Sequence, residues 1–152
     1  MSDDPALPNP SPFHDMLCFD VYAVNLAFGR IYKPLLDPLG LTYPQFLVMM
    51  VLWASDHHSV GGIGDSLGLD SSTLTPLLKR LEAANLVTRK RDMRDERRVI
   101  VSLTPQGAAL HGQSERVRTC VAGNTGLNQE TAQALREQLR RLRHRLQQPS
   151  QD

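Results

Sequence analysis

The sequence has little that would mark a secreted, membrane-embedded or disulfide-stabilised protein. Its 152 residues include only two cysteines, too few for the disulfide framework of a small secreted domain. The longest apolar run, residues 46–54, is nine residues long, which is too short to span a bilayer. The first residues lack the basic start and apolar core of a signal peptide. We therefore expect a cytoplasmic protein that contacts no membrane.

Features of an enzyme are also scarce. The sequence has no Cys-x-x-Cys motif and no thioredoxin-like alternation of strands and helices. The adjacent His57 and His58 have no cluster of acidic residues or cysteines close by in the sequence, so we interpret them as part of a solvated loop and not as metal ligands. We expect no catalytic residues, no metal and no cofactor.

Charge is distributed unevenly along the chain. The net charge is only +1, yet residues 71–104 carry eight basic and four acidic side chains, whereas residues 1–70 carry two basic and eight acidic ones. A local positive field attracts DNA phosphates more effectively than the net charge suggests. The segment 71–104 is therefore the candidate nucleic-acid-binding part.

Residues 56–104 follow the order of a winged helix-turn-helix. After a loop at residues 56–62, a short helix at 63–67 closes at Gly68, and Asp70 or Ser71 caps a second helix through about Ala84. Two strands joined by a charged tip follow, at residues 86–91 and 99–103. In such a motif the second helix enters the major groove.

Longer helices flank this motif on both sides. Apolar residues recur at three- and four-residue steps there, and Ser11-Pro12 reads as a cap and first helical position. The flanking helices are predicted at residues 11–37, 42–54, 105–122 and 128–146. The predicted fold class is therefore mostly α with a small β-wing. We expect one domain over residues 11–147, with a mobile tail at 1–10 and a short tail at 148–152.

The outward face of the second helix offers candidate DNA contacts. Small hydroxyl side chains near a helix N-terminus allow close approach to bases and phosphates, and a proline can contact a thymine methyl group. These candidates are Ser71, Ser72, Thr73, Thr75, Pro76, Lys79 and Arg80. The alternative interpretation of the hydroxyl groups is helix capping and solvation.

The wing carries a motif. Its sequence Asp95-Glu-Arg97-Arg-Val-Ile-Val101-Ser-Leu103-Thr104 resembles the wing signature of the MarR family of winged-helix regulators. The resemblance implies that Arg97 reaches into the minor groove and that Asp95 helps to orient it. Arg94, at the same charged tip, is a further candidate DNA contact. An arginine at a hairpin tip is drawn to the negative potential of a narrow minor groove. The alternative is a solvated hairpin tip.

Cys18 lies in the first helix, where we expect it beyond the first turn. A lone helical cysteine is most often a small buried hydrophobic residue. Tyr22, however, lies one turn away on the same face, and phenolic hydroxyls can donate hydrogen bonds to a thiolate, the species that a peroxide oxidises. Tyr32 is fourteen residues from Cys18, about 21 Å along a straight helix. If Tyr32 serves Cys18, it must come from a second copy.

These residues, with Tyr43-Pro44-Gln45-Phe46 and residues 69–82, resemble the organic hydroperoxide regulators (OhrR) of the MarR family. The resemblance covers about residues 13–147. It implies that Cys18 is the peroxidatic sensor, that Tyr32 and Tyr43 of the partner subunit bond to it, and that the first and last helices form the dimer. Two-cysteine members form a disulfide between subunits, which implies a resolving role for Cys120; the alternative is an inert cysteine.

The predicted function is a redox-responsive repressor. A homodimer would bind pseudo-palindromic double-stranded operator DNA. Oxidation of Cys18 by an organic hydroperoxide, followed by a disulfide to Cys120 of the partner subunit, would release the DNA. Two alternatives stay open: a MarR-type regulator controlled by a bound phenolic ligand, with Cys18 merely packed, and a thiol peroxidase.

Overall fold

A computed structural model describes residues 12–148 of the chain, which form two compact units that divide between Val117 and Arg118. The first unit holds α1 (Leu17–Leu36), a 3-10 turn η1 (Asp37–Leu39), α2 (Tyr43–Ala54), β1 (His58–Ser59), α3 (Val60–Leu67), α4 (Ser71–Ala83), β2 (Val87–Arg91), β3 (Val99–Leu103), α5 (Pro105–Ala109) and the start of α6 (His111–Asn124). The second unit holds the end of α6 and α7 (Gln129–Gln147). The predicted fold class, mostly α with a small β-wing, is confirmed.

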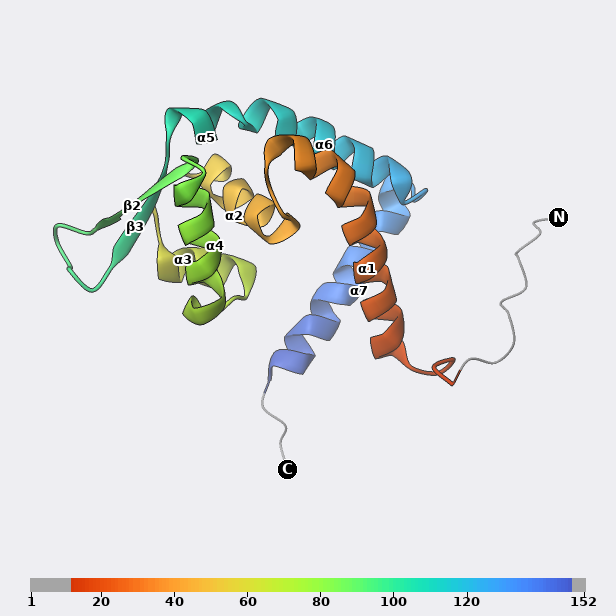
Figure 1. Cartoon of the computed structure of the whole chain (residues 1–152). Coiled ribbons are helices and arrows are strands. Elements are labelled where there is room, and N and C mark those ends of the chain that lie inside the picture. The colour runs from red at the N-terminus through yellow and green to blue at the C-terminus, as the bar shows by residue number, and fades with distance from the viewer. Residues whose placement is uncertain (1–11, 149–152) are drawn as a thin grey trace. The chain divides into compact units, whose positions relative to one another are not determined.

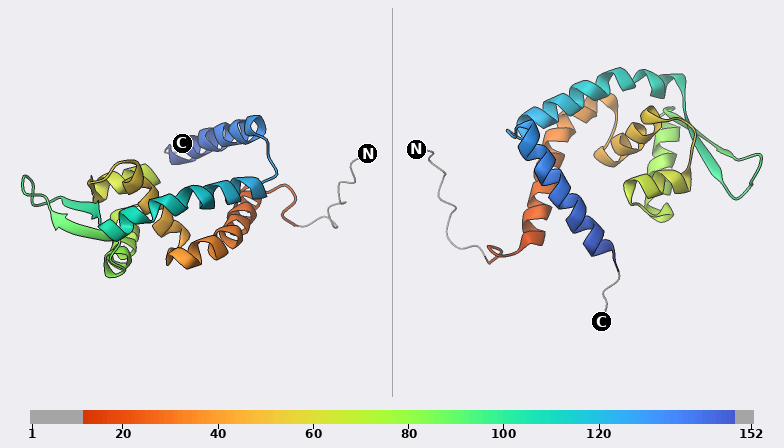
Figure 2. Two further views of the ribbon diagram at one scale, coloured as in Figure 1. Left: turned by 90° about the horizontal axis from the view of Figure 1, so that it is seen from above. Right: turned by 180° about the vertical axis from the view of Figure 1, so that it is seen from behind.

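The wing is a three-stranded antiparallel sheet of order β1-β3-β2. Strands β2 and β3 pair over their full length, from Val87 opposite Leu103 to Arg91 opposite Val99. The ribbon that they form projects away from α2, α3 and α4 in all the views (Figures 1 and 2). The predicted strands 86–91 and 99–103 are confirmed to within one residue.

The core of the first unit lies among α2, α3, α4 and the base of the wing. Leucines on α4 at positions 74, 78 and 81 face inward at helical spacing and are at most 1% exposed. The largest fully buried side chains of the core are Leu36, Phe46, Met49, Leu52, Ile63, Leu74, Leu78 and Leu81. Their burial fixes α4 against α2 and leaves its other face outward.

Side-chain caps define where the helices begin. Asp70 accepts a hydrogen bond from the Thr73 backbone N–H at 2.8 Å, as the sequence predicts, and the preceding helix ends at Gly68 with a left-handed φ of 68°. Thr42 and Gln45 form a reciprocal capping box at the start of α2. These local signals are the reason that the starts of α2 and α4 and the end of α3 could be predicted.

The start of α1 differs from the prediction. Ser11 lies outside the described residues, and Pro12–Asp15 form a turn instead of the first helical turn. Helix α1 begins at Leu17, after a Met16 N-cap that makes no side-chain hydrogen bond. The rings of Phe13 and Phe19 stack at 4.6 Å across this turn, which folds the preceding segment back on the helix. Cys18 therefore lies in the first turn of α1, contrary to the prediction.

Two further boundaries were wrong. Residues 58–59 form strand β1 instead of loop, because they pair with Ile100 and Val101 of β3, and α3 begins three residues early at Val60. The helix predicted from residue 105 to 122 divides at Leu110 into α5 and α6.

Within the described residues no single helix is long and apolar enough to cross a membrane. The segment of α1 and η1 has the required length and apolar composition only when it is counted together with α2, from which a 66° bend separates it.

The base of the wing, α2 and α5 meet at Gly107. The Trp53 indole N–H donates to the Gly107 carbonyl at 2.9 Å, and the Thr104 hydroxyl accepts from the Gly107 N–H while donating to the Asn85 carbonyl. An added β-carbon at Gly107 would overlap the Leu86 carbonyl oxygen, a backbone atom that cannot turn aside as a flexible side chain can. Only glycine permits this close approach.

We expect Gly107→Ala to lower the free energy of unfolding by about 2–3 kcal/mol, because the overlap must be relieved by moving backbone. Gly112→Ala is the matched control, since an added β-carbon there has no neighbour within 4 Å. That control should raise stability by about 0.5–1 kcal/mol. Urea unfolding at one fixed protein concentration measures the stability of both variants. Equal effects of the two substitutions would contradict the conclusion that only glycine fits at position 107.

Candidate DNA interface and redox site

The outer face of α4 is available for contact with a ligand. Six of its seven predicted DNA-contact residues are exposed, and Thr75 is half-buried. Asp70 and the buried leucines hold this helix by its N-terminus and by its inner face. The side chains that the sequence assigned to DNA therefore lie on a rigid support.

A groove of about 530 Å³ runs between α4 and the wing. Ser71 and Thr75 of α4 line one side, and Arg97, Arg98 and Arg89 of the wing line the other. The structure thus brings part of the predicted set together on one concave surface. The remaining predicted residues do not line this groove: Ser72, Thr73, Pro76, Lys79, Arg80, Arg94 and Asp95.

Acidic side chains fix the backbone of the wing tip. Asp92 accepts from the Arg94 N–H at 2.9 Å, and Asp95 accepts from the Arg97 N–H at 3.1 Å. Through this second bond Asp95 orients the Arg97 backbone, and its action on the Arg97 guanidinium stays a prediction. Asp95 sets the turn that presents Arg97 and leaves the guanidinium exposed.

Two groove arginines were missed by sequence reasoning. Arg98 is half exposed, and its Nη1 lies 3.8 Å from Asp92, a weak ion pair that leaves it accessible. Arg89 instead binds Glu82 through its guanidinium and its backbone N–H, which ties β2 to the end of α4. The Arg89 hydrogen bonds lower the pKa of Glu82 below its ordinary value of 4.5. In a regular strand the side chains of Arg97 and Arg98 would point to opposite faces of the wing. Both line the groove instead, because the turn at the wing tip sets the direction of Arg98.

Several helix hydroxyls are also used within α4. Ser72 donates to the Asp70 carboxylate at 2.8 Å, and Thr75 donates to the Ser71 carbonyl at 2.7 Å. Their donors are thus engaged while their oxygens still have lone pairs for acceptor contacts. The Ser72 hydroxyl supports the Asp70 cap and does not itself cap the helix, and its contact with DNA stays a prediction.

Cys18 is an exposed free thiol in the first turn of α1, and Tyr22 on the next turn is 58% exposed. Backbone N–H groups at a helix N-terminus carry partial positive charge, which favours an anion such as a thiolate. Around Cys18, α1 exposes large apolar side chains: Met16, Leu17, Phe19, Val21, Tyr22, Val24 and Leu26. A face of this kind marks an interaction surface.

Tyr32 and Tyr43 form a pair at the other end of α1. Their ring centroids are 4.4 Å apart, and Tyr32 lies 6.1 Å from the buried Phe46. Both tyrosines line a pocket of about 200 Å³. Because Cys18 and Tyr32 lie on one continuous helix, fourteen residues apart, about 21 Å separates them at the usual rise.

Cys120 is a free, half-buried cysteine on the part of α6 that belongs to the second unit. Its backbone carbonyl accepts from the Asn124 side chain at 2.8 Å. In the same unit α7 carries an exposed apolar row that includes Leu135, Leu139 and Leu146. Within residues 12–148 no group of three or more His, Cys, Asp or Glu side chains is arranged to hold a metal ion.

Comparison with known proteins places this architecture. The family model of the transcriptional regulator SarA/Rot matches residues 30–112. The HTH-type transcriptional regulator TtmR of Methylorubrum extorquens is 47% identical over 91% of this chain and 71% of its own. The organic hydroperoxide resistance transcriptional regulator of Bacillus subtilis is 42% identical over 82% of this chain and 85% of its own.

The chain belongs to the SarA/Rot/MarR-type winged-helix regulators. Reduced AbfR bound to DNA, a solved structure, is 35% identical, with a TM-score of 0.71 over 87% of this chain and 93% of that one. A disulfide-formed AbfR has a TM-score of 0.62 at 35% identity, covering 83% and 88% of the two chains. The predicted membership of the MarR family is confirmed. The regulator's two-cysteine type stays a prediction.

The cap of α4 makes the stability of the regulator depend on pH. Hydrogen bonds from Ser72 and Thr73 lower the pKa of Asp70 below its ordinary value of 3.8. A carboxyl group whose pKa is lower in the folded than in the unfolded chain stabilises the fold. This contribution is complete at a pH above the pKa of the unfolded chain, and it is lost as the pH falls through the pKa of the folded chain. Asp70→Asn keeps the cap oxygen but does not titrate there. The stability advantage of wild type over Asp70→Asn should therefore shrink below about pH 4.

Thermal unfolding between about pH 6 and pH 2 tests this dependence. Asp65→Asn, which removes an exposed carboxylate from α3, controls for the change of net charge. A difference between wild type and Asp70→Asn that stays constant with pH would contradict the role of the Asp70 carboxylate.

Proposed function

We propose that this transcriptional regulator is a dimeric, redox-responsive repressor that organic hydroperoxide releases from operator DNA through Cys18. The observation that carries the proposal is the separation of Cys18 from Tyr32 and Tyr43 along α1 and α2. The exposed Cys18 thiol and the pair of Tyr32 and Tyr43 lie on every chain, yet too far apart to meet within it. Two copies related by a two-fold axis would complete two such sites.

The exposed apolar faces of α1 and α7 support a homodimer. A single chain leaves Leu17, Val21 and Val24 at 43–61% exposure on α1, a cost that a second copy removes. Dimerisation helices α1 and α5 to α7 would flank the DNA-reading part at 56–104. We treat residues 11–147 as one functional domain because α6 runs through the boundary between the two compact units. As a DNA-binding regulator it would act in the cytoplasm.

The proposed chemistry begins with the Cys18 thiolate. The thiolate attacks the terminal oxygen of the hydroperoxide, the O–O bond breaks, and the alkoxide takes up a proton to leave as an alcohol. Cys18 becomes a sulfenic acid. Hydroxyls of Tyr22, and of Tyr32 and Tyr43 from the partner subunit, would donate hydrogen bonds to the thiolate before this step. The small pocket beside the tyrosines suits a compact oxidant.

The second step is condensation of the Cys18 sulfenic acid with the thiol of Cys120 of the partner subunit. A disulfide forms between the two sulfur atoms and water leaves. A disulfide needs the two α-carbons within about 7 Å, so any larger separation in the reduced dimer would have to close by helix movement. That movement would change the spacing of the two DNA-reading heads. The existence of AbfR in reduced, DNA-bound and disulfide-formed structures supports this sequence of states.

DNA would be read by α4 and the wing together. The N-terminal half of α4 would enter the major groove of double-stranded, pseudo-palindromic operator DNA, with Ser71, Thr75 and Pro76 toward the bases. Lys79, Arg80 and Arg94 would contact phosphates. Arg97 would enter the minor groove, with Arg98 beside it. The groove that joins α4 to the wing supports this simultaneous contact.

The two alternatives have less support. A regulator controlled by a bound phenolic ligand would leave the exposed Cys18 thiol without a role, and the Bacillus subtilis relative is named for organic hydroperoxide resistance. A thiol peroxidase is disfavoured because the relatives are transcriptional regulators.

We expect Cys18→Ser to bind DNA as the reduced wild type does but to remain bound after treatment with an organic hydroperoxide. Wild-type affinity should fall about 10- to 100-fold on oxidation, the usual range of coupling between two sites. Fluorescence anisotropy on a duplex selected from a random pool by reduced wild type measures both. Release of Cys18→Ser by the oxidant would show that the sensor lies elsewhere. Sustained multi-turnover reduction of peroxide would favour the alternative that the protein is a thiol peroxidase.

Cys120→Ser tests the second step separately. After oxidation the wild type should run as a covalent dimer in a non-reducing gel, and this band should be lost in Cys120→Ser and in Cys18→Ser. Cys120→Ser should also be released from DNA less completely, because its Cys18 stops at the sulfenic or a higher acid. A covalent dimer that persists in Cys120→Ser would exclude Cys120 as the resolving cysteine.

A further inference from the structure

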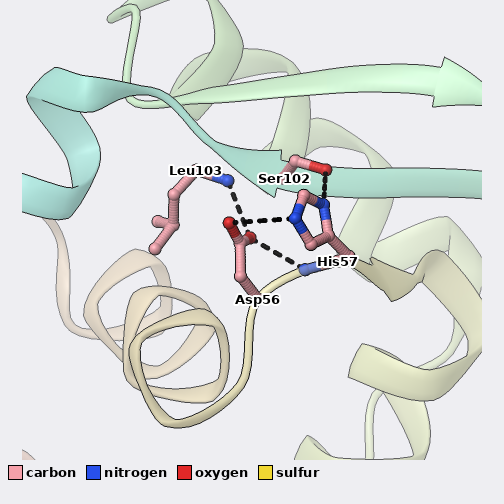
Figure 3. A network of polar contacts seen from close by, with 4 residues as sticks. All are labelled: Asp56, His57, Ser102 and Leu103. Carbon is pink, nitrogen blue, oxygen red and sulfur yellow. Dashed lines mark hydrogen bonds and ion pairs between the residues drawn. The ribbon is translucent and has the colours of Figure 1, made fainter.

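Four residues join the end of α2 to the last residues of β3 through a polar network that we call the wing clasp: Asp56, His57, Ser102 and Leu103 (Figure 3). The close-up shows the Asp56 carboxylate between the Leu103 N–H and the backbone and ring of His57. His57 lies in the loop between α2 and β1 with its side chain 71% exposed, as the sequence predicts, but its contacts with Ser102 and Asp56 were not predicted. The network spans 45 and 47 residues of sequence, so no local pattern could reveal it.

Asp56 is the centre of the clasp. Its Oδ1 accepts from the Leu103 N–H at 2.9 Å and from the His57 N–H at 2.8 Å. Its side chain is only 33% exposed. The two donors belong to different elements, the chain that leaves α2 and the end of β3. One oxygen therefore pins the wing strand to the helix-turn-helix core.

His57 closes the clasp from the other side. Its Nδ1 lies 2.7 Å from the Ser102 hydroxyl, and its Nε2 lies 3.7 Å from Asp56 Oδ2. Its φ of 63° is in the left-handed region, which a residue with a β-carbon adopts only when its surroundings hold it there. This bend lets the next residue, His58, pair with Val101 of β3.

The clasp also reaches the first helix of the DNA-reading motif. Ser59, the second residue of β1, caps α3 by accepting from the Gly62 N–H at 3.0 Å. Strand β3 begins at Val99, two residues after Arg97, and ends at Leu103 in the clasp. The end of β3 that holds the clasp is thus fixed to α2 and α3, and its other end carries the wing tip.

We infer that Asp56 and His57 are positioning residues that set where Arg97 lies relative to α4. This inference rests on the proposed function, in which Arg97 contacts the minor groove. A ribbon hinged loosely at its base would spread the tip over many positions, and ordering it on DNA would cost conformational entropy. The clasp removes that freedom before binding. Neither residue needs to touch DNA for this effect.

The direction in which DNA affinity changes distinguishes a positioning role of Asp56 from a simple effect of its negative charge. Removing an acidic side chain near DNA lowers electrostatic repulsion and strengthens binding. Loss of the clasp would instead weaken binding. Asp56→Ala is therefore expected to lower affinity for duplex DNA about three- to tenfold although it removes a negative charge. Asp56→Asn keeps an acceptor oxygen for both N–H donors and should stay within about twofold of wild type.

A double-mutant cycle with Arg97→Ala gives the decisive measurement. Affinities of reduced wild type, Asp56→Ala, Arg97→Ala and the double variant are measured on the duplex selected by reduced wild type. If Asp56 acts through the wing, its substitution should change affinity less than about twofold once Arg97 is absent. Asp65→Ala, an exposed acid on α3, is the charge-matched control and should not weaken binding.

Thermal unfolding shows whether each variant is folded at the assay temperature. If Asp56→Ala is unfolded at that temperature, Ser102→Ala replaces it in the cycle, because Ser102→Ala removes only the hydroxyl that contacts His57. Ser102→Ala is expected to lower the affinity for DNA about twofold when Arg97 is present and to leave it unchanged when Arg97 is absent. Equal losses with and without Arg97, or an Asp56→Ala variant that binds as well as wild type, would overturn the clasp inference alone. No effect of Arg97→Ala by itself would overturn the proposed wing contact as well.

Discussion

The hydrogen bond from the Trp53 indole to the Gly107 carbonyl holds together the parts on which the interface depends. It joins the end of α2 to the first turn of α5, while the Gly107 backbone lies directly against Leu86 at the start of the wing. The Trp53 ring also stacks on His111 at the start of α6, with centroids 5.6 Å apart. Core, wing base and the departing helix therefore share one contact, and displacement of any one of them disturbs the others.

The charges of the DNA-reading part divide into two kinds. Asp92, Asp95 and Glu82 shape the backbone of the wing or bind Arg89, and so the acids give form to the ribbon. The guanidinium groups of Arg97 and Arg98 remain accessible above that frame. Opposite charges interspersed along residues 82–98 thus produce a positive groove with a defined shape. An unstructured run of arginines would offer the same charge without the geometry.

Elements with a local chemical signal were predictable from sequence. Asp70, Gly68 and the leucines of α4 specify the second helix through capping, a left-handed stop and spacing, and each of these acts within a few residues. Strand β1 and the conformation of His57 depend on β3, more than 40 residues away, and no local pattern encodes them. The start of α1 was misplaced because Pro12 suits a first helical turn, whereas the observed turn involves the stacking of Phe13 on Phe19. The motif marked Arg97, Ser71 and Thr75 as separate candidate DNA contacts, but their common groove depends on how the wing packs beside α4 and could not be read from the sequence. Arg98 was not predicted at all, because the turn at the wing tip, and not strand alternation, sets its direction.

The separation of Cys18 and Tyr32, fourteen positions apart along α1, has a consequence for when the regulator becomes able to sense oxidant and bind its operator. Because Cys18 and Tyr32 lie near opposite ends of one helix, the thiol can reach this hydrogen-bond donor only when two chains associate. In the proposed arrangement, a newly synthesised monomer neither senses oxidant nor reads two half-sites. Both abilities arise in the same association event and vanish together on dilution. Cellular concentration of the chain then sets the threshold for repression and for sensing at once.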